Sequence, residues 1–251
     1  MKYLGPTFDI HAGGVDLLFP HHENEIAQSE AVTGKPFARF FMEGEHLLVN
    51  GEKMSKSLGN VYTLYDLEAK GANPLAFRYL ILTAHYRTKL NFTWESLEGA
   101  AEALKRLQSV VLELKTAPEN KEILKRSHGY LKHRADFEKA IFNDLDTPKA
   151  LAVIWKIIHE YRKSYEFRTR KKMNPKLVLE LLYSFDTILG LGLKDIRQEK
   201  IPAEIKKLAE KREKYRKEKN WQKADSIRNE IENRGWTIHD ASDGPKLKAR
   251  T

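Results

Sequence analysis

The first sixty residues alternate between short apolar runs and polar turns, a pattern that is typical of strands joined by loops. Residues 8–14, FDIHAGG, predict a short strand that ends in a glycine turn. An Asn-Gly pair within residues 39–54 predicts a hairpin between two further strands. Between them, Pro20 suits the first position of a helix that continues to Val32 and ends at TGKP. This part of the chain is therefore predicted to be α/β.

From about residue 63 onward, apolar residues recur at spacings of three and four, so the remainder is predicted to be mostly helical. A linker at residues 194–202 leads to a helical hairpin that turns near Asn220, and the tail around Gly244 is expected to be irregular. The fold class is accordingly α/β followed by all-α. Helices are expected in residues 64–71, 73–86, 93–115, 135–166 (a pair separated at Asp146 to Pro148), 177–191 and 205–236.

The composition is that of a globular protein, because 251 residues with 41% hydrophobic content can bury real cores. No apolar run approaches the ~18–20 residues that span a bilayer, and MKYLGPTFDI lacks the pattern of a signal peptide. A soluble cytoplasmic protein with no membrane partner is the expectation. The absence of cysteine excludes disulfides and thiolate metal ligands supplied by these 251 residues.

Positive charge is concentrated in the second part of the sequence. Lys and Arg number 9 against 12 Asp and Glu in residues 1–100, but 35 against 23 in residues 101–251. A basic excess of this kind is expected where a protein contacts a polyanion. The alternative is that these residues only form solvated helix faces.

The stretch FPHHENE places two histidines and two glutamates close together behind a proline. On a helix, His21 and Glu25 are four residues apart and project from one face, a spacing that suits two ligands of a tetrahedral zinc ion. Two ligands do not make a site. The alternative is that the glutamates complement a helix N-terminus and the histidines are polar surface.

A second stretch, GEKMSKSLGN, places Lys53 and Lys56 on the turn after the predicted hairpin, with Ser55 and Ser57 beside them. Two lysines on a turn can close over a triphosphate and neutralise the charge that develops on a departing pyrophosphate. A hairpin tip that happens to carry lysines is the alternative. The complete KMSKS pentapeptide with its SLGN extension is much more specific than a glycine-rich fingerprint.

KMSKS is the signature of class I aminoacyl-tRNA synthetases, and FDIHAGGVDLLFPHHENEIAQSE followed by GEKMSKSLGN resembles cysteinyl-tRNA synthetase. The resemblance extends over the whole chain and is strongest in residues 3–95. It implies that cysteine reacts with ATP, supplied with magnesium, to give cysteinyl adenylate and pyrophosphate. The cysteinyl group would then pass to the tRNA for cysteine.

The resemblance also implies a zinc ion that recognises the substrate thiol through two cysteines, a histidine and a glutamate. The last two correspond to His21 and Glu25, so the chain holds half of that ligand set. Sulfur is a better partner than a serine oxygen for this metal, which accounts for selectivity between the two amino acids.

Nucleotide-binding residues are likewise implied by position. Lys56 matches the lysine assigned to ATP, while Gly13, Gly14 and Asp16 match a GGxD segment that binds adenosine. Glycines let a backbone approach a ligand closely and a carboxylate accepts from ribose hydroxyls, although the glycines alone could simply form a tight turn. His11 is expected near the same pocket, where a structural role is the alternative. Glu43 departs from the Met-His of many family members.

In the C-terminal segment, Arg216, Trp221 and Asp225 match family positions that read the tRNA anticodon. An indole can stack on a base, and Arg and Asp can bond base edges. From spacing alone, Trp221 could equally be the apolar plug of the hairpin and Asp225 a cap. The basic helix at 206–219 would add attraction to phosphates.

The resemblance divides the chain into four predicted parts: residues 1–62, a partial catalytic domain with the lysine turn; 63–118, a helical junction; 119–198, a helical bundle; and 199–251, a basic anticodon-recognition region. The first part corresponds to the C-terminal half of a Rossmann-like domain. In the family, a HIGH motif and both zinc-binding cysteines precede the position of Met1. The chain is therefore expected to need a complementary N-terminal partner for catalysis and to be inactive by itself.

Two alternative functions share these motifs. A catalytically inactive tRNA-binding or regulatory relative would keep the fold, but it would have no chemical need for both KMSKS and HHENE. A ligase that joins cysteine to an aminosugar shares both motifs, but it should lack the basic C-terminal hairpin with its Arg, Trp and Asp.

Overall fold

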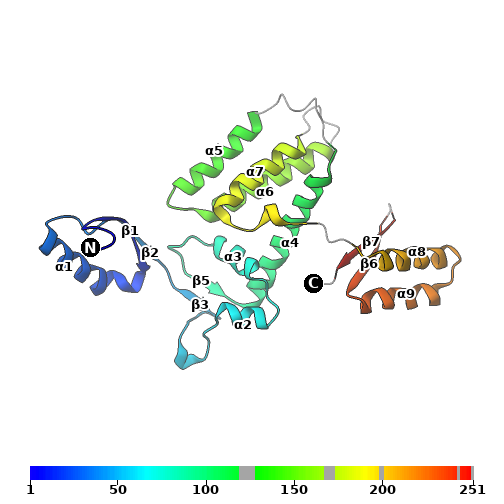
Figure 1. Ribbon diagram of the computed structural model, residues 1–251, viewed down its shortest axis with the longest axis horizontal. Helices are drawn as coiled ribbons and strands as arrows, with labels where there is room; N and C mark the ends of the chain where they lie inside the picture. Colours follow the sequence, from blue (N-terminus) through cyan, green and yellow to red (C-terminus); the bar gives the residue numbers. More distant parts are fainter. Residues whose placement is uncertain (119–127, 167–172, 198–200, 242–243, 250–251) are drawn as a thin grey trace. The chain divides into compact units, whose positions relative to one another are not determined.

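In the computed structural model, the chain begins with two parallel strands, β1 (Phe8–Gly14) and β2 (Ala38–Gly44), connected through helix α1 (Glu23–Thr33) (Figure 1). The helix begins at Glu23, later than the predicted start at Pro20, because two short helical turns at Val15–Leu17 and Leu18–His22 precede it. It ends as predicted, at Gly34, whose φ of 63° is left-handed.

A three-stranded sheet follows, in the order β4-β3-β5. Strands β3 (Leu47–Val49) and β4 (Glu52–Lys53) form the predicted hairpin, and its turn residues Asn50 and Gly51 both have positive φ, as a tight two-residue turn requires. Strand β5 (Leu90–Phe92) pairs in parallel with β3 and was not predicted.

The described part of residues 64–196 contains six α-helices, and capping residues explain where four of them start. Thr63 and Thr93 each make a capping box, while Asn73 and Asn174 each cap a helix that opens on proline. The helices are α2 (Leu64–Ala69), α3 (Pro74–Leu82), α4 (Trp94–Thr116), α5 (His128–Phe142), α6 (Thr147–Glu166) and α7 (Pro175–Leu189).

The turn between α5 and α6 is held from outside the bundle. Asp144 and Leu145 both have φ of 55°, an uncommon conformation for residues other than glycine. The Asp144 carboxylate accepts bonds from the Tyr86 hydroxyl at 2.5 Å and from Arg87 Nε at 2.6 Å. The Arg87 guanidinium keeps the pKa of Asp144 below its usual value.

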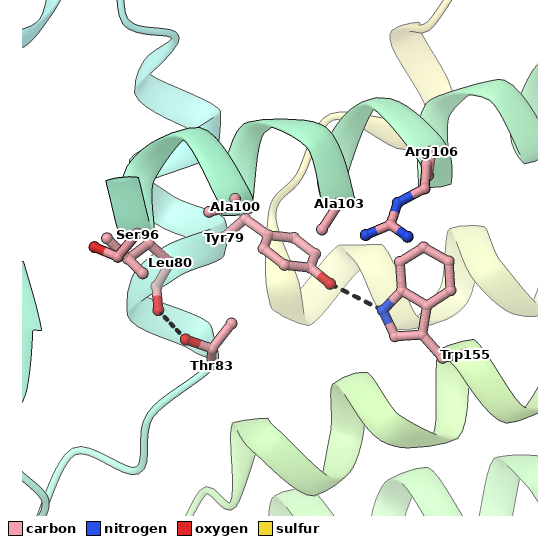
Figure 2. A pocket seen from close by; sticks show the side chains of 9 residues that line it. Tyr79, Leu80, Thr83, Ser96, Ala100, Ala103, Arg106 and Trp155 are labelled. Atoms are coloured by element: carbon pink, nitrogen blue, oxygen red, sulfur yellow. Dashed lines mark hydrogen bonds between the residues drawn. The ribbon is translucent and has the colours of Figure 1, made fainter. Parts of the chain in front are cut away.

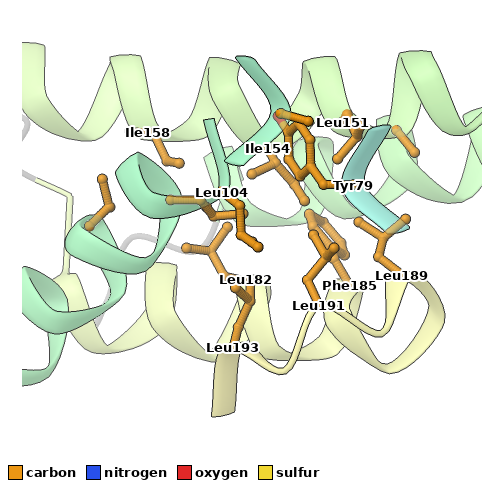
Figure 3. Packing of buried hydrophobic residues seen from close by; sticks show 14 of the residues in the cluster. Tyr79, Leu104, Leu151, Ile154, Ile158, Leu182, Phe185, Leu189, Leu191 and Leu193 are labelled. Carbon is orange, nitrogen blue, oxygen red and sulfur yellow. The ribbon is translucent and has the colours of Figure 1, made fainter. Parts of the chain in front are cut away.

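The main core lies where α4, α6 and α7 meet (Figure 3). Phe137 and Phe185 stack inside it with ring centroids 3.9 Å apart and an interplanar angle of 5°. Buried apolar residues in this unit run from Val49 to Leu193, whereas residues 1–44 bury none; there, only His22 is buried. The β1–α1–β2 segment and the residues before it therefore leave large apolar side chains exposed, among them Tyr3, Leu4, Ile10, Phe19, Val32 and Phe40.

The C-terminal unit has a small core of its own. Helices α8 (Ala203–Lys217) and α9 (Trp221–Asn233) lie side by side, and strands β6 (Trp236–Ala241) and β7 (Gly244–Ala249) pair antiparallel beside them (Figure 1). The prediction of an irregular tail is therefore wrong. The core comprises Ile205, Ala209, Ile227, Ile231 and Ile238.

The structure describes residues 1–118, 128–166, 173–197, 201–241 and 244–249, and divides the chain into compact units of residues 1–196 and 197–251. The predicted boundaries at 118/119 and 198/199 fall at or within segments outside the described residues, so the four-part division stays a prediction. Among the helices that the structure describes, none is long and apolar enough to span a bilayer.

Candidate functional site

The carboxyl end of the β1–β2 pair gathers three of the four predicted nucleotide-binding residues, all except Lys56. The parallel register places Gly13 opposite Glu43 and Gly14 opposite Gly44, and Asp16 follows in the next turn. A Cβ on Gly14 would lie 2.5 Å from Asp16 Oδ1, so the glycine leaves room for that carboxylate. Ligands of open α/β sheets bind at the carboxyl ends of parallel strands, which is where these residues lie.

His22 is buried under this strand end, with 1% of its surface exposed. A Cβ on Gly13 would lie 2.8 Å from the His22 imidazole, so only glycine lets the ring approach. His22 Nδ1 forms a 2.8 Å hydrogen bond with Glu43 Oε1. The other carboxylate oxygen of Glu43 is buried with no partner among the described residues. Sequence reasoning gave neither residue a role, because the two lie 21 positions apart and no local pattern pairs them.

His11, His21 and Glu25 meet at one carboxylate oxygen. Glu25 Oε2 lies 2.8 Å from His11 Nε2 and 3.6 Å from His21 Nε2. Two ligands of one tetrahedral zinc ion lie about 3.4 Å apart, so the His21–Glu25 pair has a suitable spacing. Ligand atoms of His11, His22 and Glu25 also lie within 4.8 Å of one another. These histidines and the glutamate do not by themselves make a zinc centre, and their metal role stays a prediction.

The lysine loop, residues 53–60, is held in shape by Asn60. Its side-chain oxygen accepts a bond from the Ser55 backbone N–H at 2.8 Å, and its amide nitrogen donates to the Lys53 carbonyl at 3.2 Å. Met54 packs against the main core. The ammonium groups of Lys53 and Lys56 are exposed and make no ion pair or hydrogen bond with the described residues. The loop therefore presents two uncommitted positive charges.

Replacing Asn60 by alanine should loosen this loop. Loss of both amide bonds removes roughly 1 kcal/mol or more of local stability, so trypsin should cleave after Lys53 and Lys56 about fivefold to tenfold faster. Time-resolved mass spectrometry of the digest measures this rate. Asn60→Asp keeps the acceptor and loses the donor, so its rate should be intermediate. Equal rates in all three proteins would show that the clasp does not order the loop.

The structure does not bring the lysine loop into contact with the strand-end cluster. Across the described part of residues 1–44 and 53–60, no hydrogen bond, ion pair or ring contact joins Lys56 to Asp16 or His21. A backbone bond from Glu45 to the Tyr86 carbonyl, at 2.8 Å, connects the end of β2 to the helical part. A shared cleft between the two groups stays a prediction.

In the C-terminal unit, the structure brings Arg216 and Trp221 together, with the guanidinium 5.7 Å from the indole centroid. Trp221 is 56% exposed, so it is not the plug of the hairpin. Asp225 is exposed and forms no ion pair or hydrogen bond with the residues described. The unit carries 16 Lys and Arg against 10 Asp and Glu over residues 197–251, a net charge of +6 in the total of +9. An exposed indole beside an arginine on a basic unit suits contact with RNA bases.

Asp240 organises this surface and was not predicted. It accepts two bonds from the buried Arg212, at 2.8 and 3.2 Å, and lies 3.0 Å from Arg216. Twenty-eight residues separate Asp240 from Arg212, so no local pattern pairs them. The β6–β7 hairpin is what places the carboxylate against α8.

The stability of this unit should depend on pH through Asp240. The hydrogen bond from Arg212 holds the pKa of Asp240 below its unfolded value. The carboxylate therefore stabilises the fold above about pH 4 and loses this effect as pH falls through the lowered pKa. Urea unfolding of the full chain with Trp94 and Trp155 replaced by phenylalanine, so that Trp221 and Trp236 report this unit, should show stability falling below pH 4. Asp240→Asn should flatten that fall, and an unchanged slope would contradict the assignment.

Comparison with known proteins gives one consistent family. A model described as tRNA synthetases class I (C) catalytic domain matches residues 1–102. Over 99% of its length the chain is 44% identical to proteins named cysteine–tRNA ligase from Chlamydia abortus and Chlamydia felis, and 41% identical to one from Protochlamydia amoebophila. In each case it covers 52% of the relative, so the chain spans about half the length of the curated relatives it matches.

The fold is also found among solved structures, and one example is similar over most of this chain. It is the ternary complex of Agrobacterium radiobacter K84 agnB2 LeuRS-tRNA-LeuAMS, which matches 75% of this chain and 26% of that chain. The TM-score is 0.53 and the sequence identity is 16%, so the likeness concerns the fold alone. This likeness agrees with the family match, which indicates a class I synthetase catalytic domain, here followed by additional helices.

Proposed function

Because the chain belongs to the cysteine–tRNA ligase family of class I aminoacyl-tRNA synthetases, we propose that its residues serve in ATP-dependent activation of cysteine and transfer of cysteine to its tRNA. The observation that carries this proposal is the 44% identity over 99% of the chain, a range that includes both the lysine loop and the α8–α9 hairpin. The 251 residues supply part of that machinery, in the cytoplasm where tRNA is charged.

Two lysines act on the phosphates of ATP. In the first step the cysteine carboxylate attacks the α-phosphorus, a P–O bond breaks, and pyrophosphate leaves with the electron pair. Lys56 and Lys53 neutralise the charge on the leaving group, which is greater in the transition state than in bound ATP. Their freedom from ion pairs in the described residues supports this role. Gly13, Gly14 and Asp16 receive the adenosine.

His21 and Glu25 would supply two of the four ligands of a zinc ion. Their spacing of 3.6 Å fits this role, and the two thiolates must come from outside a sequence that contains no cysteine. When bound, zinc would hold the substrate as a thiolate. His11 Nε2 donates to the Glu25 carboxylate at 2.8 Å, which positions the carboxylate beside the amino acid pocket.

The C-terminal unit would read the tRNA anticodon through Arg216, Trp221 and Asp225. The position of the Arg216 guanidinium over the Trp221 ring and the exposed carboxylate of Asp225 support that role. In the same scheme, residues 1–62 form the second half of a Rossmann-like domain, residues 63–118 a junction, and residues 119–198 a helical bundle.

A chimaera tests the proposal. Residues 1–251 replace the matching half of the Chlamydia abortus ligase, and incorporation of pyrophosphate into ATP is measured with cysteine, with serine and with neither. Exchange that depends on cysteine, followed by charging of a tRNA transcript with the GCA anticodon, is the expected result. The 251 residues alone should give no exchange, because they hold no thiolate ligand. A folded chimaera without cysteine-dependent exchange would overturn the proposal.

The two other functions are separated by the same experiment. A chimaera that binds tRNA but exchanges no pyrophosphate would indicate an inactive tRNA-binding relative. Exchange with cysteine but transfer to an aminosugar and not to tRNA would indicate the aminosugar ligase. The folded α8–α9 hairpin with its exposed Trp221 argues against the second of these.

A further inference from the structure

A groove on the helical part of the first unit is lined by none of the residues to which a role was assigned above. It lies between α3, α4 and α6, with a volume of about 430 Å³, and Tyr79, Trp155 and Arg106 are among its lining residues (Figure 2). Binding sites for small molecules begin at about 300 Å³. The groove is thus large enough for one nucleotide.

The floor of the groove is made of small residues of α4: Ser96, Gly99, Ala100 and Ala103. Steric crowding does not explain why residue 99 is glycine, since a Cβ at Gly99 would meet no atom within 4 Å. Glycine inside a helix costs about 1 kcal/mol relative to alanine, so its presence at an unconstrained position keeps this floor low at some expense in stability.

The aromatic wall carries an unused donor. Trp155 Nε1 donates to the Tyr79 hydroxyl oxygen at 2.9 Å (Figure 2). Tyr79 is 5% exposed, and its hydroxyl donates to no group in the described ranges. A buried hydroxyl hydrogen without an acceptor favours a ligand that offers an oxygen or a ring nitrogen.

Arg106 places an uncompensated positive charge at the same groove. Its guanidinium lies 5.9 Å from the Trp155 ring centroid, and its Nε reaches only the Glu102 carbonyl, at 3.4 Å. No carboxylate of the described residues pairs with it, whereas the adjacent Lys105 pairs with the Glu102 side chain at 3.5 Å. A free guanidinium beside aromatic rings is suited to a phosphate joined to a flat base.

We propose that this groove binds one nucleotide, with the phosphate on Arg106 and the sugar and base against the small-residue floor and the Tyr79–Trp155 wall. The favoured ligand is an unstacked nucleotide in the body of the tRNA, and this choice rests on the proposed function. A free mononucleotide has the same chemistry, so both sources are tested.

The first arm measures binding of the full chain to a tRNA transcript with the GCA anticodon, at fixed salt, by filter retention. Arg106→Gln should weaken binding about tenfold, while the matched control Lys105→Gln, which removes one charge from the same helical turn, should change it less than twofold. Ala103→Leu raises the floor and should also weaken binding about tenfold. Circular dichroism melting shows whether each variant is folded.

The second arm titrates AMP into the full chain with Trp221 and Trp236 replaced by phenylalanine, so that Trp94 and Trp155 report. If AMP quenches the fluorescence and Arg106→Gln abolishes the quenching, the groove binds a free nucleotide. If AMP causes no quenching but the variants weaken tRNA binding, the groove binds a nucleotide of the RNA. If Arg106→Gln and Ala103→Leu match Lys105→Gln in both arms, the inference is overturned. Failure of the proposed function would appear separately, as tRNA binding with the same affinity whatever the anticodon sequence. That result would not change the outcome of the AMP titration.

Discussion

Replacing Lys56 by alanine is expected to lower kcat for cysteine-dependent pyrophosphate exchange by roughly 10²- to 10³-fold in the Chlamydia abortus chimaera. The ammonium group is exposed, has no partner among the described residues, and meets charge that grows as pyrophosphate leaves. Because that contact strengthens in the transition state, KM for ATP should change much less than kcat.

Lys70→Ala is the matched control for this experiment. Lys70 lies close in sequence to the loop, but its ammonium group is over the rings of Tyr62 and Trp94, at 5.1 and 4.6 Å from their centroids. Its removal should leave kcat within about twofold, since it lies outside the loop. If Lys56→Ala raises KM and leaves kcat unchanged, the lysine binds ATP in the ground state and the transition-state role is wrong.

Phe185→Ala is expected to destabilise the first unit by about 3–5 kcal/mol. Phe185 is 2% exposed and stacks on Phe137, so its removal leaves a cavity in the centre of the bundle and deprives Phe137 of its partner. Urea unfolding measures the change. Trp221 and Trp236 are replaced by phenylalanine, so that the two remaining indoles report the unit of residues 1–196 alone.

Ile188→Ala provides the comparison on the same helix. Ile188 is 52% exposed, so its truncation should cost about 0.5 kcal/mol or less. A loss below about 1 kcal/mol for Phe185→Ala would mean that the α5–α7 contact is not part of the cooperative core.

Helices with strong apolar periodicity and recognisable caps could be predicted from the sequence, because both signals are local. The helix predicted in residues 93–115 is α4, Trp94–Thr116, capped by Thr93. Strand β5 could not be predicted, because Leu90–Phe92 becomes a strand only by pairing with β3, about forty residues earlier. The β6–β7 strand pair escaped prediction because Gly244 signals a turn, whereas here it begins a strand that pairs with β6.

The candidate site divides in the same way. Lys53, Lys56 and their Asn60 clasp lie within eight residues, so the local sequence carries both the loop and its charge. His22 lies in the turn before α1 and Glu43 lies in β2, and the two are 21 positions apart, so no local signal pairs them. Sequence spacing correctly put His21 beside Glu25, but it could not show that His11 shares the same carboxylate.

The bare apolar surface of the β1–α1–β2 segment has a consequence for the fate of this polypeptide in a cell. Chaperones and proteases recognise exposed apolar segments as marks of unfinished folding, and an open strand edge invites self-association. The 251 residues expressed by themselves should therefore associate with one another or with chaperones, and a partner that covers these apolar side chains should reduce that association.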